Sequence, residues 1–309
     1  MGVKLSHLSQ VFSSHKCDDR TMRYFELLKL LRIKQYSKNL FCLIPVFFGC
    51  ELYNSQSLQT SVWAFLTFCI ASSSVYIIND LTDLKQDKKH SLNRFRPLAK
   101  GTVSRTAACV FCTFLIILSF LCAGALGKSA IYVIAEYLVL NLLYCFILKK
   151  VFLADILCIS LGFELRAYLG CIAINHQMTF FLFIEILLLC TMLVLSKRLY
   201  EKSISSSRRV LKRYSLKFCQ TSIQLTAVLL DFVWVLYTFY GEPVVKMSDN
   251  TSLLFKTTSV ITTAVIYRYV CLSFKNRTGY QLGCILCQDL ILGLCTVLIV
   301  LLCYLSLYS

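Results

Sequence analysis

The sequence predicts an all-α fold, a polytopic bundle of membrane-spanning helices, and three observations support this prediction. Of the 309 residues, 57% are hydrophobic and only 16% are charged, whereas an average soluble chain carries about a quarter charged residues. The mean hydropathy is +0.68. Apolar runs of roughly twenty residues, long enough to cross a bilayer as a helix, recur along the chain. Together these properties argue against a soluble globular protein.

The excess of basic residues does not indicate a nucleic-acid partner. The formal net charge is +16, but the Lys and Arg residues lie between apolar runs rather than on one soluble face. The seventeen cysteines lie mostly inside apolar segments, where a thiol behaves as a small buried hydrophobe, so they do not indicate a disulfide framework.

The apolar runs predict about nine spans, with ends uncertain by several residues. Residues 1–37 are expected to form a cytoplasmic N-terminal and amphipathic segment, and residues 38–309 a single transmembrane catalytic domain. The predicted spans lie near residues 38–53, 58–79, 104–126, 129–148, 151–174, 178–197, 217–240, 252–272 and 288–308. The first span is short and contains Pro45, which makes it the weakest of the nine.

The loops between these spans alternate in charge, and the alternation predicts the orientation. The segments before span 1 and after spans 2, 4, 6 and 8 carry nearly all the Lys and Arg residues. Positive residues stay on the cytoplasmic side. We therefore expect an integral membrane protein with the N-terminus inside and the C-terminus outside.

One polar segment, residues 79–101, separates two long apolar runs and reads NDLTDLKQDKKHSLNRFRPLAKG. On a continuing helix, Asn79, Asp80, Asp83 and Asp87 share one face. Carboxylates gathered at a membrane boundary repel one another unless a cation lies among them, and hard oxygen ligands suit Mg²⁺. Basic candidates for phosphate binding follow them, namely His90, Arg94 and Arg96. This pattern predicts a magnesium–diphosphate site that faces the cytoplasm.

Three further regions supply candidate binding residues. The basic amphipathic segment before span 1 contains Lys34 and Lys38, which could contact lipid headgroups or substrate phosphate, and the sequence leaves both roles open. Span 6 ends with Lys197, Arg198 and Glu201 on one helical face. Within span 5, Arg166 could bind phosphate bidentately or pair with a buried acid.

These motifs resemble the UbiA superfamily of intramembrane prenyltransferases, and within it the decaprenyl-phosphate phosphoribosyltransferases. The specific match is N-D-x-x-D-x-x-x-D followed by His and R-x-R-P-L-A-x-G. LLRIKQYSKN at 30–39, LGFELRA at 161–167 and SKRLYE at 196–201 are weaker matches to the narrower branch. The chain departs from that branch at Ile33, which replaces a proline, and at Asn93, which replaces a lysine.

The resemblance implies a UbiA-like fold and an Mg²⁺-dependent transferase of cell-envelope biosynthesis in a bacterial inner (plasma) membrane. It would transfer 5-phosphoribose from phosphoribosyl diphosphate to a polyprenyl phosphate and release diphosphate. Asp80, Asp83 and Asp87 would hold the metal, and Glu201 would serve with them in catalysis. The substrate-binding residues would be Lys34, Lys38, Asn79, His90, Arg94, Arg96, Arg166, Lys197 and Arg198.

Two other functions stay open at this point. The same aspartates could ionise a prenyl diphosphate for transfer to an aromatic acceptor. Buried charges also mark the substrate paths of membrane transporters and lipid carriers. The chain has only three prolines, however, and this scarcity argues against the interrupted spans that transporters use. The expected partners are the polyprenyl phosphate lipid, the phosphorylated sugar diphosphate and the membrane, and the sequence is compatible with a homo-oligomer.

Overall fold

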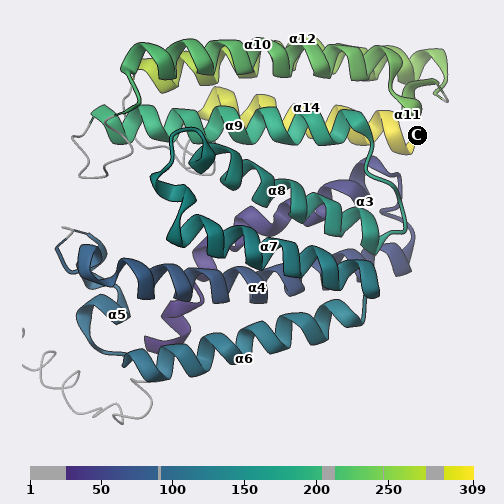
Figure 1. The fold of residues 1–309 in the computed structure, drawn as a ribbon. Helices are drawn as coiled ribbons and strands as arrows, with labels where there is room; N and C mark the ends of the chain where they lie inside the picture. Colours follow the sequence, from purple (N-terminus) through teal and green to yellow (C-terminus); the bar gives the residue numbers. More distant parts are fainter. Residues whose placement is uncertain (1–25, 90–91, 204–212, 246, 276–288) are drawn as a thin grey trace, which may run out of the picture. The chain divides into compact units, whose positions relative to one another are not determined.

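The structure is a computed structural model that describes residues 26–89, 92–203, 213–245, 247–275 and 289–309. Every regular element in these ranges is a helix (Figure 1). The chain divides into two compact units. Unit 1 contains Met1–Tyr36 and Ile70–Leu118, and unit 2 contains Ser37–Cys69 and Ser119–Ser309. The helices η1 (Ile33–Leu43), α4 (Ser55–Asp87) and α6 (Arg105–Gly124) each have residues in both units.

Unit 1 contains the predicted acidic segment. After α4 ends, the chain forms η2 (Asn93–Phe95) and the short helix α5 (Pro97–Lys100). Pro97 begins α5, and Gly101 ends it with a left-handed φ of 85°, a conformation that glycine adopts without steric cost. Buried apolar side chains join these elements to residues 26–31 and to α6, and they are Leu30, Ile77, Leu84, Leu98, Val103, Ala108, Cys112 and Leu115. This core places the end of α4 beside the segment that follows it.

Unit 2 contains most of the long helices. They are α7 (Lys128–Phe146), α8 (Ala154–Ala173), α9 (Phe180–Ser203), α10 (Leu216–Tyr240), α12 (Asp249–Lys275) and α14 (Leu290–Tyr308), with the short elements α3 (Ile44–Phe48), η3 (Leu148–Lys150) and α11 (Glu242–Val245) between them. Each long helix packs on the next one in this order, from α7 to α14 (Figure 1). Short connections join α7 to α8, α8 to α9 and α10 to α12, and short connections make consecutive helices antiparallel neighbours.

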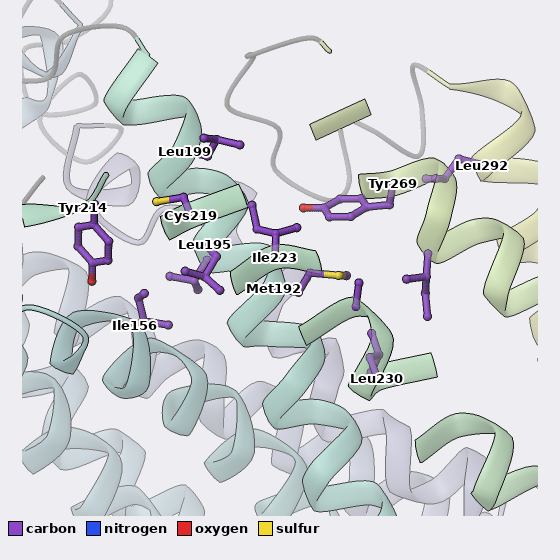
Figure 2. Close-up of a cluster of buried hydrophobic side chains, with 13 residues drawn as sticks. Ile156, Met192, Leu195, Leu199, Tyr214, Cys219, Ile223, Leu230, Tyr269 and Leu292 are labelled. Atoms are coloured by element: carbon purple, nitrogen blue, oxygen red, sulfur yellow. The ribbon is translucent and has the colours of Figure 1, made fainter. Parts of the chain in front are cut away.

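The main core of unit 2 lies around the C-terminal end of α9, the end that is predicted to face the cytoplasm. Figure 2 shows side chains of α8, α9, α10, α12 and α14 pointing toward one another, among them Ile156, Leu195, Ile223 and Tyr269. This packing fixes the last turns of α9, which carry Lys197, Arg198 and Glu201, against the first turn of α8.

A glycine allows η1 and α8 to approach closely. A Cβ atom added at Gly170 would lie 2.2 Å from the carbonyl oxygen of Cys42. Any larger residue at this position would push the backbone of η1 away from α8, since two backbones meet there rather than a backbone and a flexible side chain.

Seven of the described helices are long and apolar enough to cross a membrane, so the prediction of an all-α membrane architecture is confirmed. The first predicted span, 38–53, is not one helix, because η1 ends at Leu43 and the five-residue α3 begins with Pro45 in its first turn. The predicted span 252–272 lies in α12, whose 27 residues include Lys256 and Arg268, and α12 is outside the seven. The count of nine, the single domain from residue 38 and the orientation stay predictions.

Candidate functional site

Two aspartates of unit 1 converge on one nitrogen atom. Nη1 of Arg96 lies 3.0 Å from Oδ1 of Asp80 and 2.7 Å from Oδ2 of Asp87. The two carboxylates are seven residues apart on α4, which is two helical turns, so they project from the same face. Their side chains are only 4% and 6% exposed, whereas that of Arg96 is 29% exposed. The space between the two carboxylates can therefore hold a positive charge, and solvent reaches this charge where the Arg96 side chain is exposed.

Two further residues complete what we call the aspartate cluster, which consists of Arg32, Asp80, Asp87, Asn93 and Arg96. The guanidinium of Arg32 pairs with Oδ1 of Asp80, and Nδ2 of Asn93 donates to Oδ1 of Asp87 at 2.9 Å. Arg32 has a positive φ of 51°, and a non-glycine residue is held in such a conformation only when its surroundings over-determine it.

The other predicted residues of this region are less tightly gathered. Asn79 and Asp83 are half-buried on α4, and Lys34 is exposed on η1. Arg94 is exposed, with its guanidinium carbon 4.8 Å from the ring centre of Phe95. Within the described ranges, no three His, Cys, Asp or Glu side chains are grouped closely enough to hold a metal ion. The geometry thus pairs Asp80 with Asp87, while His90 lies outside the described residues.

A second group of charges, the Arg198 network, lies in unit 2. Nε of Arg198 is 2.9 Å from Oδ2 of Asp155, and its Nη1 donates to Glu201. The hydroxyl of Tyr214 donates to Asp155 and accepts the backbone N–H of Leu153 at 3.1 Å. The side chains of Arg198 and Asp155 are 2% and 1% exposed.

The Arg198 network joins the end of α9 to the start of α8. Asp155 lies in the first turn of α8, where the partial positive charge of the helix N-terminus favours a carboxylate. Arg198 and Glu201 contact each other three residues apart, in agreement with the predicted shared face. Lys197, by contrast, is exposed, so it is the cation of this helix end that solutes reach most readily.

Arg166 occupies a buried polar site of its own in unit 2. Its Nε donates to Oδ1 of Asn39 at 2.8 Å, its Nη2 donates to the hydroxyl of Tyr137 at 3.0 Å, and its Nη1 donates to the carbonyl of Gly162. The rings of Phe68, Tyr137 and Phe163 lie 5.0–5.2 Å from its guanidinium carbon. These contacts are with neutral oxygens and aromatic faces rather than with a buried acid. Lys38, next to Asn39, is half-buried.

Four residues of the aspartate cluster and the Arg198 network were not among the sequence candidates. Asp155 carried a signal, because a carboxylate inside a span is costly unless it is paired. Arg32 carried a weaker one, as part of the basic amphipathic segment. Nothing in the sequence predicted the hydrogen bonds of Asn93 and Tyr214, since these contacts depend on the path of the loops that precede α5 and α10.

The described helices and the aspartate cluster define an α-helical integral membrane protein with an acidic site at the end of a span. The UbiA prenyltransferase family model matches residues 42–245, and the chain belongs to this family.

Among curated proteins, the chain is 32% identical over 215 residues to the decaprenyl-phosphate phosphoribosyltransferase of Mycolicibacterium smegmatis, covering 68% of this chain and 65% of that protein. It is 30% identical over 257 residues to the enzyme of the same name from Corynebacterium glutamicum, covering 79% and 75%. The match thus spans just under two thirds of the length of the first relative.

Among solved structures, a UbiA homologue from Archaeoglobus fulgidus bound to GPP and Mg²⁺ matches with a TM-score of 0.69 and 17% identity, over 92% of this chain and 100% of that chain. A solved structure of digeranylgeranylglyceryl phosphate synthase matches with a TM-score of 0.66 and 15% identity, over 93% of this chain and 100% of that chain. At these identities the likeness establishes the shared fold, and the UbiA-like architecture expected from the sequence is confirmed.

Proposed function

We propose that this protein transfers 5-phosphoribose from phosphoribosyl diphosphate to a polyprenyl phosphate and releases diphosphate, with Mg²⁺ as cofactor. The observation that carries the proposal is the convergence of Asp80 and Asp87 on one positively charged atom. The two relatives named above are phosphoribosyltransferases of this kind, which favours this transfer over others within the family.

The aspartate cluster fits a divalent cation. Asp80 and Asp87 supply hard carboxylate oxygens that already meet at one point, and Asp83 shares their helical face. Bound Mg²⁺ would neutralise the charge of the leaving diphosphate. Asn79 would orient the carboxylates, while Arg96, Arg94, Lys34 and His90 would provide positive charge to the diphosphate oxygens.

The reaction itself requires little proton transfer. An ionised oxygen of the polyprenyl phosphate attacks the anomeric carbon of the donor, a new carbon–oxygen bond forms, and the bond to diphosphate breaks as diphosphate leaves with the electron pair. Because the attacking phosphate is already ionised, no strong general base is needed. Positive charge on the sugar ring rises in the transition state, so a carboxylate such as Glu201 would stabilise it or orient a sugar hydroxyl.

In unit 2, the exposed Lys197 would contact the second phosphate of the donor. Arg198 is fully engaged with Asp155 and Glu201, so its substrate role would be to hold Lys197 and Glu201 in position. Arg166 would similarly position Asn39 and the neighbouring Lys38. The proposed location is the bacterial plasma membrane, with the site open to the cytoplasm, where a water-soluble sugar diphosphate is available.

A second function, prenyl transfer from a prenyl diphosphate to an aromatic acceptor, uses the same aspartates. It is favoured by the fold neighbour bound to GPP and Mg²⁺. A membrane transporter or lipid carrier is a third hypothesis, based on the buried charges alone.

The products distinguish these functions. The purified protein is incubated with Mg²⁺ and polyprenyl phosphate, once with radiolabelled phosphoribosyl diphosphate and once with a labelled prenyl diphosphate and an aromatic acid. The proposal predicts label in the lipid phase from the sugar donor only. Transfer of the prenyl group instead would replace the proposal with the second function, and absence of both products would favour the third.

Lys197 offers an independent check. We expect Lys197→Ala to weaken binding of the sugar donor by about 1.5–3 kcal/mol, the range for a hydrogen bond to a charged group. Lys202, a half-buried lysine five residues further along α9, is the matched control in a Lys202→Ala variant. Unchanged donor affinity in Lys197→Ala would remove Lys197 from the site.

A further inference from the structure

An open groove of about 790 Å³ lies on unit 2 between α7, α8 and the start of α9. Its walls are mostly aliphatic and aromatic, and they include Val139, Leu140, Leu143, Leu161, Leu165 and Phe183. Apolar walls are ordinary on a surface that faces lipid, so by themselves they point to no ligand.

The buried carboxylate of Glu164 in this groove is unusual. Glu164 of α8 lines it and is only 4% exposed, and neither carboxylate oxygen has a hydrogen-bond partner among the described residues. Glu136 of α7 lines the same groove. The basic residue nearest to Glu164 in sequence, Arg166, directs its hydrogen bonds to Asn39, Tyr137 and Gly162 instead.

Both glutamates lie deep within their helices. At 1.5 Å per residue, Glu164 is about 14 Å from the end of α8 and Glu136 about 12 Å from the start of α7, close to half of a hydrocarbon core of about 30 Å. Lipid headgroups stay outside that core, and a lipid chain carries no hydrogen-bond donor at such depth. A donor at mid-membrane is most readily supplied by a side chain of another helix.

We propose that this groove receives a transmembrane helix of a partner membrane protein that carries a Lys or Arg near the middle of its span. A cationic side chain would satisfy the buried carboxylate of Glu164 and balance Glu136, and the apolar walls would pack against the rest of the helix.

A second copy of this chain lacks the required residue in its described spans. The basic side chains furthest from helix ends are Arg166, Lys256 and Arg268. Arg166 is buried, Lys256 lies over the ring of Phe239, and Arg268 is paired with Asp289 at 2.8 Å. The groove contains no residue of the aspartate cluster or of the Arg198 network, so this inference does not depend on the proposed activity.

The test uses two synthetic polyleucine helices, one with a single central Lys and one with Leu at that position. Each peptide carries an energy-transfer acceptor and is titrated against the donor-labelled full-length protein in phosphatidylcholine vesicles. We expect the Lys peptide to bind at least about threefold more tightly than the Leu peptide, as for a buried interhelical polar contact. Glu164→Gln should reduce this preference toward one.

Glu185→Gln is the matched control. Glu185 on α9 also has a buried oxygen without a partner among the described residues, but it does not line the groove, so the preference for Lys should persist. Thermal unfolding in detergent reports whether each variant folds. If Glu164→Gln does not fold, Leu161→Trp fills the groove from its exposed wall and should abolish binding of the Lys peptide.

A photoreactive residue in place of Leu161 identifies the occupant. Cross-linking to the Lys peptide is expected. Equal binding of the two peptides, an unchanged preference in Glu164→Gln, or retained binding in Leu161→Trp would overturn the inference. Cross-linking in the presence of the Lys peptide only to a second copy, or only to lipid, would also overturn it.

Discussion

The aspartate cluster and the Arg198 network are both built from an arginine between two acids, yet they differ in exposure. The bridging arginine of the aspartate cluster is 29% exposed, and it contacts two carboxylates through the same nitrogen. Arg198 is 2% exposed and contacts Asp155 and Glu201 through different nitrogens. An arginine near solvent can leave its acids at modest cost, whereas a buried one leaves uncompensated charge behind. We infer that the aspartate cluster exchanges its cation during function and that the buried pair of Arg198 and Asp155 supports the fold.

The largest effect should follow from removing one carboxylate of the aspartate cluster. We expect Asp80→Asn, Asp87→Asn and, because it shares their helical face, Asp83→Asn each to reduce transfer of label at least about a hundredfold, since a charged metal ligand is lost. Glu26→Gln, a change of carboxylate in the same unit but outside the cluster, is the control. Rates near that of the parent at saturating Mg²⁺ would place the metal elsewhere.

Breaking the Arg198 network should mainly affect folding. Asp155→Ala leaves a buried guanidinium with one of its two acids, and we expect it to lower the free energy of unfolding by about 3 kcal/mol or more. Thermal unfolding in detergent measures this change, and Mg²⁺ should not reverse it. A variant with the stability of the parent would show that Asp155 contributes no net support to α8 and α9.

Arg96→Gln should lose stability that Mg²⁺ restores, in contrast to Asp155→Ala. It leaves Asp80 and Asp87 facing each other with less positive charge, so we expect a lower unfolding temperature without metal and recovery in millimolar Mg²⁺, because a ligand that binds only the folded state stabilises it. Arg94→Gln, at an exposed neighbour that stacks on Phe95, is the matched control and should show neither effect. A loss of stability in Arg96→Gln that is independent of Mg²⁺ would erase the contrast between the two sites.

The smallest effect is expected at Glu26, which accepts hydrogen bonds from Lys29 and Thr102. The hydrogen bond from Lys29 lowers the pKa of Glu26 below its usual value. A lowered pKa stabilises the fold above the unfolded-state pKa, near 4.3, and the contribution disappears as the pH falls through the folded-state pKa. Because this pair is exposed, Glu26→Gln should cost less than about 1 kcal/mol at neutral pH. A larger loss in urea unfolding at pH 7 would show that the contact with Thr102 supports unit 1.

The sequence could predict those parts of the site that depend on helical periodicity. Asp80 and Asp87 were placed on one face by their spacing, and the contact of Arg198 with Glu201 follows from a separation of three residues. The partners that come from distant parts of the chain were not predictable in this way. Asp155 meets Arg198 only because α8 packs on α9. Arg32 pairs with Asp80 from a distant part of the chain, and its own backbone is left-handed there.

The fold shows the same limit. Composition and run length were enough to predict membrane helices, since a span must satisfy its backbone hydrogen bonds internally. They overestimated the first span, where an apolar run predicts one helix, although η1 ends at Leu43 and α3 begins anew with Pro45 in its first turn. The close approach of η1 to Gly170 of α8 depends on tertiary packing, for which a single glycine in an apolar run is too weak a signal.

The most direct test of the cation exchange is to count bound Mn²⁺, used in place of Mg²⁺, by electron paramagnetic resonance in the presence of diphosphate. The parent protein, Asp87→Asn and a conservative Asp155→Asn variant of the Arg198 network are compared at equal concentrations of folded protein. The account predicts diphosphate-dependent Mn²⁺ binding in the parent, its loss in Asp87→Asn and its retention in Asp155→Asn. Equal Mn²⁺ binding by the parent and Asp87→Asn would contradict the assignment of the aspartate cluster as the metal–diphosphate site.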